Sequence, residues 1–555
     1  MSSTRPHADA GALVQHVADQ LLDAHQQWTR TIEARGGWDY ETPDDRTARH
    51  RREDDWLRVL RPMEGTLAIG SPAWVTHGML RQELEASVRS RIAHFHLWDV
   101  NQMTGWHLGV AYTASSIAVN TPEEREAALR RFGSLPAMIR ARIGDLRYGR
   151  SEGYTAARKT VVRVVQQIEA LLAGPTLDAA ASRTDDRSFA AAWRNLMAEH
   201  VRPAFQEYRD FLANHYMLSA RENGALVSLP QGLDVYRSEV FRFTSLDLTP
   251  EQVLAGAEDE IAQIDAQLGP ILGRLYPGAP LAEAKRAMRE DVRHTHPTRA
   301  HMIDHARAVL DKIKPQLPRF FLHVPDLPLV VEPMTPVEER IGASAYYQSP
   351  EGGNPGRFVI NTAHAQQCGR WETTCAAVHE AYPGHHFERI YGDQRSSRHP
   401  ATRELQTQAF REGWAFYSEW LVNDMGVYET DAERAGYLLH PLEVWVGLVS
   451  DVLLHTGRLS HEQAVDMLIT RAGRLPHVAE ARADRYIAAP GQVTCYMLGY
   501  REVRRFRRDA EAALGERFDA REFHDVLLRD GPITLPMQRA KITEWIEENR
   551  HAHVR

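Results

Sequence analysis

The chain has 555 residues, of which 43% are hydrophobic and 25% are charged, a balance typical of soluble globular proteins. A chain of this length can bury a large core, and we expect roughly two to four lobes. The formal net charge of −8 argues against a nucleic-acid-binding protein, because such proteins usually carry an excess of basic residues.

The cysteines and the first residues of the chain bear on the cellular compartment in which the protein is expected. Cys368, Cys375 and Cys495 form no Cys-x-x-Cys spacing and no even-numbered disulfide framework, which favours a reducing environment. The N-terminus lacks the apolar core of a signal peptide, and no window approaches the ~18 uncharged apolar residues of a membrane-spanning helix. We therefore expect a cytoplasmic protein with no membrane partner and no nucleic-acid partner.

Residues 1–220 are predicted to form an N-terminal helical lobe. Apolar residues recur there at three- and four-residue steps, for example at Leu80 and Leu84. Thr121 followed by Pro122 is typical of a helix start. The expected helical segments are 11–61 with breaks near Gly36 and Pro43, 73–118, 129–174 and 187–220.

Residues 221–315 are predicted to form a helical linker region. Within it, Thr249 can cap a helix that begins at Pro250 and runs to Leu268. Four histidines follow between positions 294 and 305, at a spacing typical of solvated or capping side chains.

Residues 316–365 have the composition of β-structure. Short apolar runs lie between prolines, and two later segments flank a loop rich in glycine and proline. They predict a small antiparallel sheet. The expected strands include 320–322, 329–331, 346–347 and 357–361. Residues 366–555 return to a helical pattern and are predicted to form the catalytic region, so the expected fold class is mainly α with several helical lobes.

The stretch 371–388, W-E-T-T-C-A-A-V-H-E-A-Y-P-G-H-H-F-E, carries the densest set of chemical groups in the chain. A His-Glu pair that emerges from an apolar helix, with more histidines close behind, is typical of zinc hydrolases. In the usual motif the second metal-binding histidine follows the first by four residues, but here that position is Pro383.

Two histidines compete for the place of second metal ligand beside His379. On an uninterrupted helix of about 3.6 residues per turn, His386 returns to within roughly 20° of His379. Pro383 and Gly384 oppose such a helix, because proline removes a hydrogen-bond donor and kinks the axis. If they form a bulge, His385 takes that place instead. Both alternatives stay open, with His385 slightly preferred.

Zinc at a catalytic site takes three protein ligands and leaves one position for water. Glu412, about thirty residues after His379, is the candidate for the third ligand. Glu380 is the candidate general base that takes a proton from the attacking water. Isolated His-Glu pairs are common and do not by themselves indicate a metal site. A Pro-Gly pair destabilises an apolar helical segment, so its presence there indicates a function that offsets the loss. The residues therefore favour a metal site.

Four blocks in this order, H-E-A-Y-P-G-H-H, R-E-G-W-A-F-Y-S-E-W, P-G-Q-V-T-C-Y-M-L-G and F-H-D-V-L-L-R-D-G, resemble the DUF885 family of bacterial proteins. That family is similar to gluzincin-type zinc metallopeptidases with mostly helical folds. The resemblance runs from roughly Leu229 to the C-terminus and more weakly through 99–105. It implies a metallopeptidase-like fold around one zinc ion, while the first two hundred residues match poorly and leave the substrate open.

The resemblance also implies substrate-binding residues. Tyr347 and Asn361 match the segment before the zinc helix, where an edge strand can pair with an extended peptide. Arg485 would bind a substrate carboxylate through two hydrogen bonds, although a structural ion pair is the commoner role of a single arginine.

Further residues gain catalytic roles from the same resemblance. Asp451 would orient a metal ligand, and His455 would donate to a developing oxyanion; a buried pair that only ties helices together is the alternative. Tyr496 or Tyr500 would donate a proton to the tetrahedral intermediate, and Tyr500 would also bind the substrate; a core tyrosine with a satisfied hydroxyl is the alternative.

The expected function is that of a zinc-dependent hydrolase that cleaves peptide or amino-acyl amide bonds in short substrates. A second hypothesis keeps the metal site but assigns it to a specialised small-molecule pathway, with iron or another transition ion, because histidine and glutamate alone do not select the metal. A third, a non-enzymatic binding protein with a vestigial site, predicts no stoichiometric metal. The sequence predicts no oligomeric state.

Overall fold

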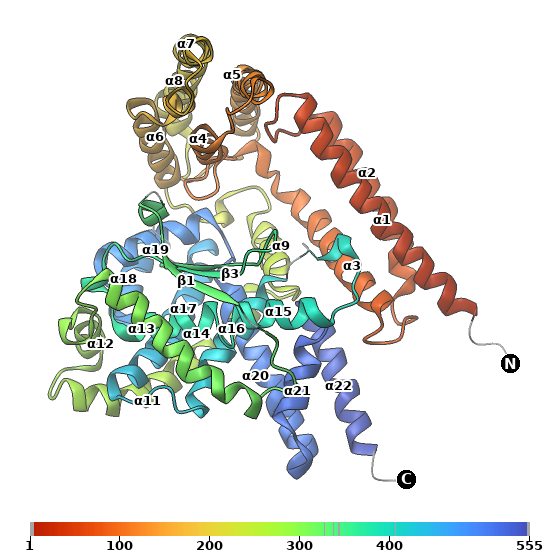
Figure 1. The fold of residues 1–555 in the computed structure, drawn as a ribbon, viewed down its shortest axis with the longest axis vertical. Coiled ribbons are helices and arrows are strands. Elements are labelled where there is room, and N and C mark those ends of the chain that lie inside the picture. The colour runs from red at the N-terminus through yellow and green to blue at the C-terminus, as the bar shows by residue number, and fades with distance from the viewer. Residues whose placement is uncertain are drawn as a thin grey trace.

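The computed structural model describes residues 5–326, 328–336, 338–341, 344–403, 405 and 407–551. The fold is mainly α, as predicted, and the described residues include one small sheet. Figure 1 shows a helical body that holds the C-terminal half of the chain, a group of helices above it, and a long pair of N-terminal helices along one side.

The N-terminal helices pack around two separate cores. The first core includes Val14, Leu57 and Leu80 and joins three helices. These are α1 (Arg5–Ala34), α2 (Pro43–Leu60) and α3 (Pro72–Ser90). The second core contains Trp193 and Phe205 and lies in the group at the top of Figure 1. Its helices are α4 (Trp106–Ser116), α5 (Pro122–Ser151), α6 (Arg158–Ala173), α7 (Arg187–Leu196) and α8 (Arg202–Phe211).

Two predicted helix starts are confirmed in detail. Thr121 caps α5 and Thr249 caps α10, each followed by a proline at the first helical position. The backbone amide of each threonine donates to the side chain three residues later, which completes a capping box. The helix that begins at Pro250 is shorter than predicted, because the chain turns at Gly256 with a φ of 77°. The helices of this region are α9 (Gly232–Thr244), α10 (Pro250–Leu254), α11 (Ala257–Leu275), α12 (Leu281–Glu290) and α13 (Arg299–Ile313).

The sheet has three strands in the order β1-β3-β2. β1 (Leu329–Pro333) pairs parallel to β3 (Gly356–Ile360), and β2 (Ala345–Gln348) pairs antiparallel to β3. The prediction of an antiparallel sheet is therefore wrong for β1. Since β3 enters between the first two strands, β1 has no hairpin partner, and its neighbour comes from more than twenty residues away.

The predicted strand at 320–322 does not form. Pro315 and Pro318 hold the preceding residues in a 3₁₀ helix, Lys314–Arg319, and the chain then turns. Phe321 packs its ring 4.4 Å from that of Phe387, so the apolar run serves the helical core and not a sheet.

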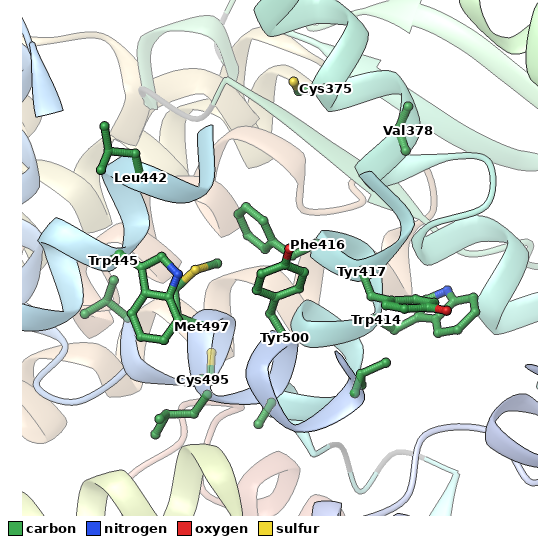
Figure 2. Close-up of a cluster of buried hydrophobic side chains, with 14 of the residues drawn as sticks. Cys375, Val378, Trp414, Phe416, Tyr417, Leu442, Trp445, Cys495, Met497 and Tyr500 are labelled. Atoms are coloured by element: carbon green, nitrogen blue, oxygen red, sulfur yellow. The ribbon is translucent and has the colours of Figure 1, made fainter. Parts of the chain in front are cut away.

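The C-terminal helices surround the largest core. They are α14 (Arg370–Glu380), α15 (His385–Arg395), α16 (Gln408–Asp424), α17 (Asp431–His455), α18 (His461–Ala472), α19 (Pro476–Ala488), α20 (Thr494–Leu514), α21 (Ala520–Leu528) and α22 (Leu535–His551). Figure 2 shows side chains of α14, α16, α17 and α20 meeting there, among them Phe416, Trp445 and Tyr500.

Two glycines set the distance between α16 and α20. A Cβ atom on Gly499 would lie 1.8 Å from the carbonyl oxygen of Ala409, and one on Gly413 would lie 2.2 Å from the backbone of Gly499. Only glycine fits at such a backbone contact. The crossing therefore places Gly413, the residue after Glu412, against Gly499 and Tyr500 of α20.

Among the described residues, α17 alone is long and apolar enough to cross a membrane by length and composition. Its most apolar window has a mean hydropathy of 1.4, and 78% of that window is buried inside the protein. Such burial is expected of a helix at the centre of a large core.

Candidate metal centre

The Pro-Gly pair interrupts the motif helix, as predicted. α14 ends at Glu380 and α15 begins at His385. The amide of Gly384 donates to the carbonyl of Val378 at 3.1 Å, and a Cβ on Gly384 would lie 2.0 Å from the carbonyl oxygen of His379. The carbonyl of Pro383, which no longer belongs to a helix, accepts from Trp414 Nε1 at 2.8 Å.

This interruption brings His385 beside His379. The Nε2 atom of His379 lies 3.3 Å from Glu412 Oε2, and that of His385 lies 3.6 Å from the same oxygen. The three possible ligand atoms all lie within 4.8 Å of one another. Two imidazoles and one carboxylate are a donor set of catalytic zinc sites, so the residues present fit a zinc ion.

His386 lies in a different place from the cluster, which corrects its assignment as an alternative ligand. Its ring is fully buried, and Nδ1 lies 3.1 Å from the hydroxyl of Tyr347 on β2. A Cβ on Gly356 of β3 would meet the same ring at 2.7 Å. His386 therefore joins α15 to the sheet, because the bulge turns it away from the side that His379 faces.

Glu419 holds His379 from behind the cluster. His379 Nδ1 lies 2.8 Å from Glu419 Oε1, and His440 Nδ1 on α17 lies 2.8 Å from Glu419 Oε2. A carboxylate on the second nitrogen of a metal-binding histidine orients its ring and makes it a better ligand. Sequence reasoning gave this orienting role to Asp451 and missed Glu419 and His440.

Glu419 could have been found from its spacing, because it follows Glu412 by seven residues on one helix and so lies two turns along the same face. His440 carries no comparable signal. It lies on another helix, and only the packing of α17 against α14 brings its ring 6.1 Å from that of His379.

The charges around His379 favour a cation. Burial alone would lower the pKa of His379, but its hydrogen bonds to Glu412 and Glu419 raise that pKa well above the ordinary value. Burial would raise the pKa of Glu412, yet its contacts with His379 and His385 hold that pKa well below the usual range. A buried positive charge is thus stabilised here, and a divalent cation would satisfy the same carboxylates.

Glu380, the predicted base, is the last residue of α14 and is half-buried next to His379. Its negative charge contributes to the raised pKa of His379, its neighbour in the chain.

Tyr496 and Arg485 lie on the α20 side of the cluster. The ring of Phe416, one turn after Glu412, is 5.1 Å from the ring of His379 and 6.1 Å from that of Tyr496. Burial raises the pKa of Tyr496, and the charge of Glu412 raises it further. Arg485 Nη2 donates to the Tyr496 hydroxyl at 3.2 Å. These contacts link Arg485 to Tyr496, and Tyr496 through Phe416 to His379.

Tyr500 instead lies in the core. It is buried, its hydroxyl accepts from Arg504 at 3.2 Å, and its ring packs against Phe416 among the apolar side chains of Figure 2. This placement matches the alternative of a core tyrosine. The role proposed for Tyr500 in substrate binding finds no support in these contacts.

His455 and Asp451 are engaged within the fold. His455 Nε2 donates to the carbonyl of Tyr486 at 3.0 Å, and Asp451 accepts from the Tyr236 hydroxyl at 2.7 Å and from the amide of Gly491. Burial lowers the pKa of His455 to about 3 and raises that of Asp451 to about 8, so both are neutral at pH 7. These contacts match a buried pair that ties helices together, and they do not bring His455 to the metal ligands.

Asn361 also makes contacts within the protein. Its side chain donates to the carbonyl of Glu339 and accepts from the amide of Ala363, both at 3.1 Å. These bonds shape the loop after β3. Tyr347 lies on β2, an edge strand, with its hydroxyl on His386.

The fold and the cluster define a mainly α protein with a His-His-Glu site at the end of a buried helix. The chain belongs to the DUF885 family, which is described as bacterial protein of unknown function, and the family model matches residues 27–542. A search of curated proteins finds no match.

Two solved structures share the fold. One is a "putative lipoprotein" from Colwellia psychrerythraea, with a TM-score of 0.83 and 20% sequence identity over 98% of this chain and 99% of the other. The second is a "putative lipoprotein of unknown function" from Shewanella oneidensis, with a TM-score of 0.77 and 17% identity over 95% of this chain and 99% of the other. At such identities the likeness shows a common fold.

Proposed function

We propose that this protein is a metal-dependent hydrolase that cleaves peptide or amino-acyl amide bonds in short substrates. The observation that carries the proposal is the convergence of His379, His385 and Glu412, with Glu419 fixing the first histidine from behind. A second carboxylate, Glu380, is adjacent and is not needed as a ligand. Because Glu380 is not one of the three ligands, its carboxylate is available to act as the general base.

Zinc held by these residues would polarise the scissile carbonyl and favour ionisation of water near neutral pH. Glu380 accepts the proton of the attacking water and later delivers it to the leaving amine. The Tyr496 hydroxyl accepts hydrogen bonds from Arg485 and Gln492, so its own proton is free to donate to the oxygen of the substrate carbonyl. Tyr496 therefore takes the part first considered for His455.

His440 is a further candidate for proton transfer. Its side chain is 29% exposed, and its Nδ1 atom is fixed by Glu419, a buried carboxylate. An imidazole oriented in this way presents its other nitrogen in a defined direction, as histidines that act in catalysis do.

The test is the Glu380→Gln variant assayed with a library of short peptides. We expect wild-type protein loaded with zinc to cleave members of the library, and the variant to retain the metal while its rate falls by about 10²–10⁴-fold, the usual contribution of a general base. Cleavage by the variant at the wild-type rate would remove Glu380 from this role. Exposed Glu429→Gln is the control.

The donor set also leaves room for the small-molecule pathway enzyme, since two histidines and one carboxylate bind iron as well as zinc. Elemental analysis of the purified protein separates the two proposals. Zinc together with peptide cleavage supports the first, and iron without peptide cleavage supports the second. We retain a cytoplasmic location as part of the proposal, with Cys368, Cys375 and Cys495 present as free thiols.

A further inference from the structure

Arg485 on α19 is a half-buried charged side chain whose hydrogen-bond partners are neutral. In the described part of the chain, no carboxylate lies within ion-pair distance of its guanidinium, whereas Arg482, one turn earlier, lies 3.4 Å from Glu443. Arg474 also contacts Glu443. The structural ion pair that is the commoner role of a single arginine is therefore formed by the neighbours and not by Arg485.

Neutral groups hold Arg485 in place. Its Nη2 atom donates to Gln492 Oε1 at 2.9 Å and to the Tyr496 hydroxyl at 3.2 Å. Gln492 Nε2 donates to the same hydroxyl at 3.1 Å, which closes a three-membered network. The network orients the guanidinium without neutralising it. Because a half-buried charge without a counter-ion is unfavourable, such an arrangement favours the arrival of an anion.

The network lies next to the metal ligands. The Gly413–Gly499 contact locks α16 against α20, the helices that carry Glu412 and Tyr496, and the charge of Glu412 raises the pKa of Tyr496. The ring of Phe416 contacts those of both His379 and Tyr496. Phe416 and Tyr496 thus connect His379 to Arg485 through two ring contacts and one hydrogen bond. An anionic group bound at Arg485 would belong to the same substrate molecule.

We propose that Arg485 binds the free carboxylate of the substrate, so that the protein acts on short peptides or N-acyl amino acids that end in a carboxylate close to the scissile bond. The planar fork of a guanidinium matches a carboxylate through two hydrogen bonds and discriminates against a neutral amide. In the reaction the C–N bond breaks, the hydroxyl of water adds to the carbonyl carbon, and a proton passes to the leaving amine. The carboxylate at Arg485 takes no part in these bond changes.

This inference rests on the proposed function, and a binding experiment separates the two. The ligands are acetyl-alanyl-alanine and the same compound with a C-terminal amide, titrated into zinc-loaded Glu380→Gln protein so that no turnover intervenes. We expect the free acid to bind about 10- to 100-fold more tightly than the amide, the range for a hydrogen bond to a charged group. Arg485→Gln should abolish the preference, and Arg485→Lys should retain only part of it, because lysine lacks the fork.

Arg482→Gln is the matched control, since it removes an arginine from the same helix without touching the network, and it should keep the full preference. Equal affinities for acid and amide, or a preference that survives Arg485→Gln, would overturn the inference. Wild-type hydrolysis of both compounds at equal rates would also overturn it while leaving the proposed function intact. A carboxylate preference in binding together with no hydrolysis of any peptide would instead contradict the proposed function alone.

Discussion

The candidate metal centre depends on the hydrogen bond between His379 and Glu419. In this bond, Nδ1 of the imidazole lies 2.8 Å from a carboxylate that is almost fully buried. That bond leaves Nε2 facing Glu412 and His385. Because the same carboxylate also binds His440, it couples α14, α16 and α17 at a single point.

Replacing Glu419 with glutamine should weaken zinc binding by about 10- to 100-fold, the usual effect of losing a partner of a metal-binding histidine. The amide still fills the space but no longer strengthens His379 as a ligand. A competition titration against a chromophoric chelator measures the change. Asp424→Asn, an exposed substitution on the last turn of the same helix, serves as the control. An unchanged zinc affinity in Glu419→Gln would refute the orienting role.

His385 and His386 are neighbours in sequence but should behave differently on substitution. His385→Ala should reduce bound zinc well below one ion per chain, because it removes a ligand of the cluster. His386→Ala should retain the zinc and lower the melting temperature, since it empties a buried site against Tyr347. Metal content and thermal unfolding of both variants provide the comparison. Loss of zinc in the second variant with retention in the first would reverse the assignment.

Gly499→Ala tests the helix crossing that positions Glu412. The new methyl would lie 1.8 Å from the carbonyl oxygen of Ala409, so the helices must move apart, and we expect a loss of about 1–3 kcal/mol in the free energy of unfolding. Gly269→Ala in α11, where no atom lies near the added methyl, is the matched control and should be neutral or stabilising. Urea denaturation reports both values, and similar stabilities for the two variants would contradict the close contact.

The buried Asp451 predicts a pH-dependent stability. Burial raises its folded pKa to about 8, whereas an unfolded aspartate has a pKa of about 4. The folded protein holds this proton more tightly, so the stabilisation is complete below about pH 4 and is lost as the pH rises towards about 8. Asp451→Asn keeps a neutral side chain and should gain stability relative to wild type over that interval, by up to about 1.4 kcal/mol per pH unit.

The measurement is denaturant unfolding of both proteins at several pH values between 4 and 8. His455, whose pKa is lowered to about 3, is present in both proteins, so its contribution cancels to first order in the difference. A difference that stays constant with pH would show that Asp451 is ionised in the folded state.

Local features of the fold could be predicted from the sequence, and pairings between distant segments could not. Thr121 and Thr249 cap helices because the signal lies within four residues of each cap. The parallel pairing of β1 with β3 depends on the path of the chain between the two strands, and no local residue pattern predicts that path. The apolar residues 320–322 have the composition of a strand, but no strand forms there because Phe321 packs against Phe387 in the helical core.

The same division applies to the candidate site. The sequence predicted His379 and Glu412, and Pro383-Gly384 indicated the interruption that brings His385 into place. His440 was missed because it meets Glu419 only through packing between α16 and α17. Asp451 and His455 have the spacing of a catalytic pair, yet their surroundings make them a buried link between helices.

Equilibrium dialysis against zinc, followed by elemental analysis, tests whether the cluster holds a metal ion. The arrangement of His379, His385 and Glu412 predicts one zinc ion per wild-type chain and almost none in His379→Ala protein whose folding is verified by circular dichroism. A wild-type protein that binds no stoichiometric metal, or a His379→Ala variant that binds as much as wild type, would contradict a metal site at these residues.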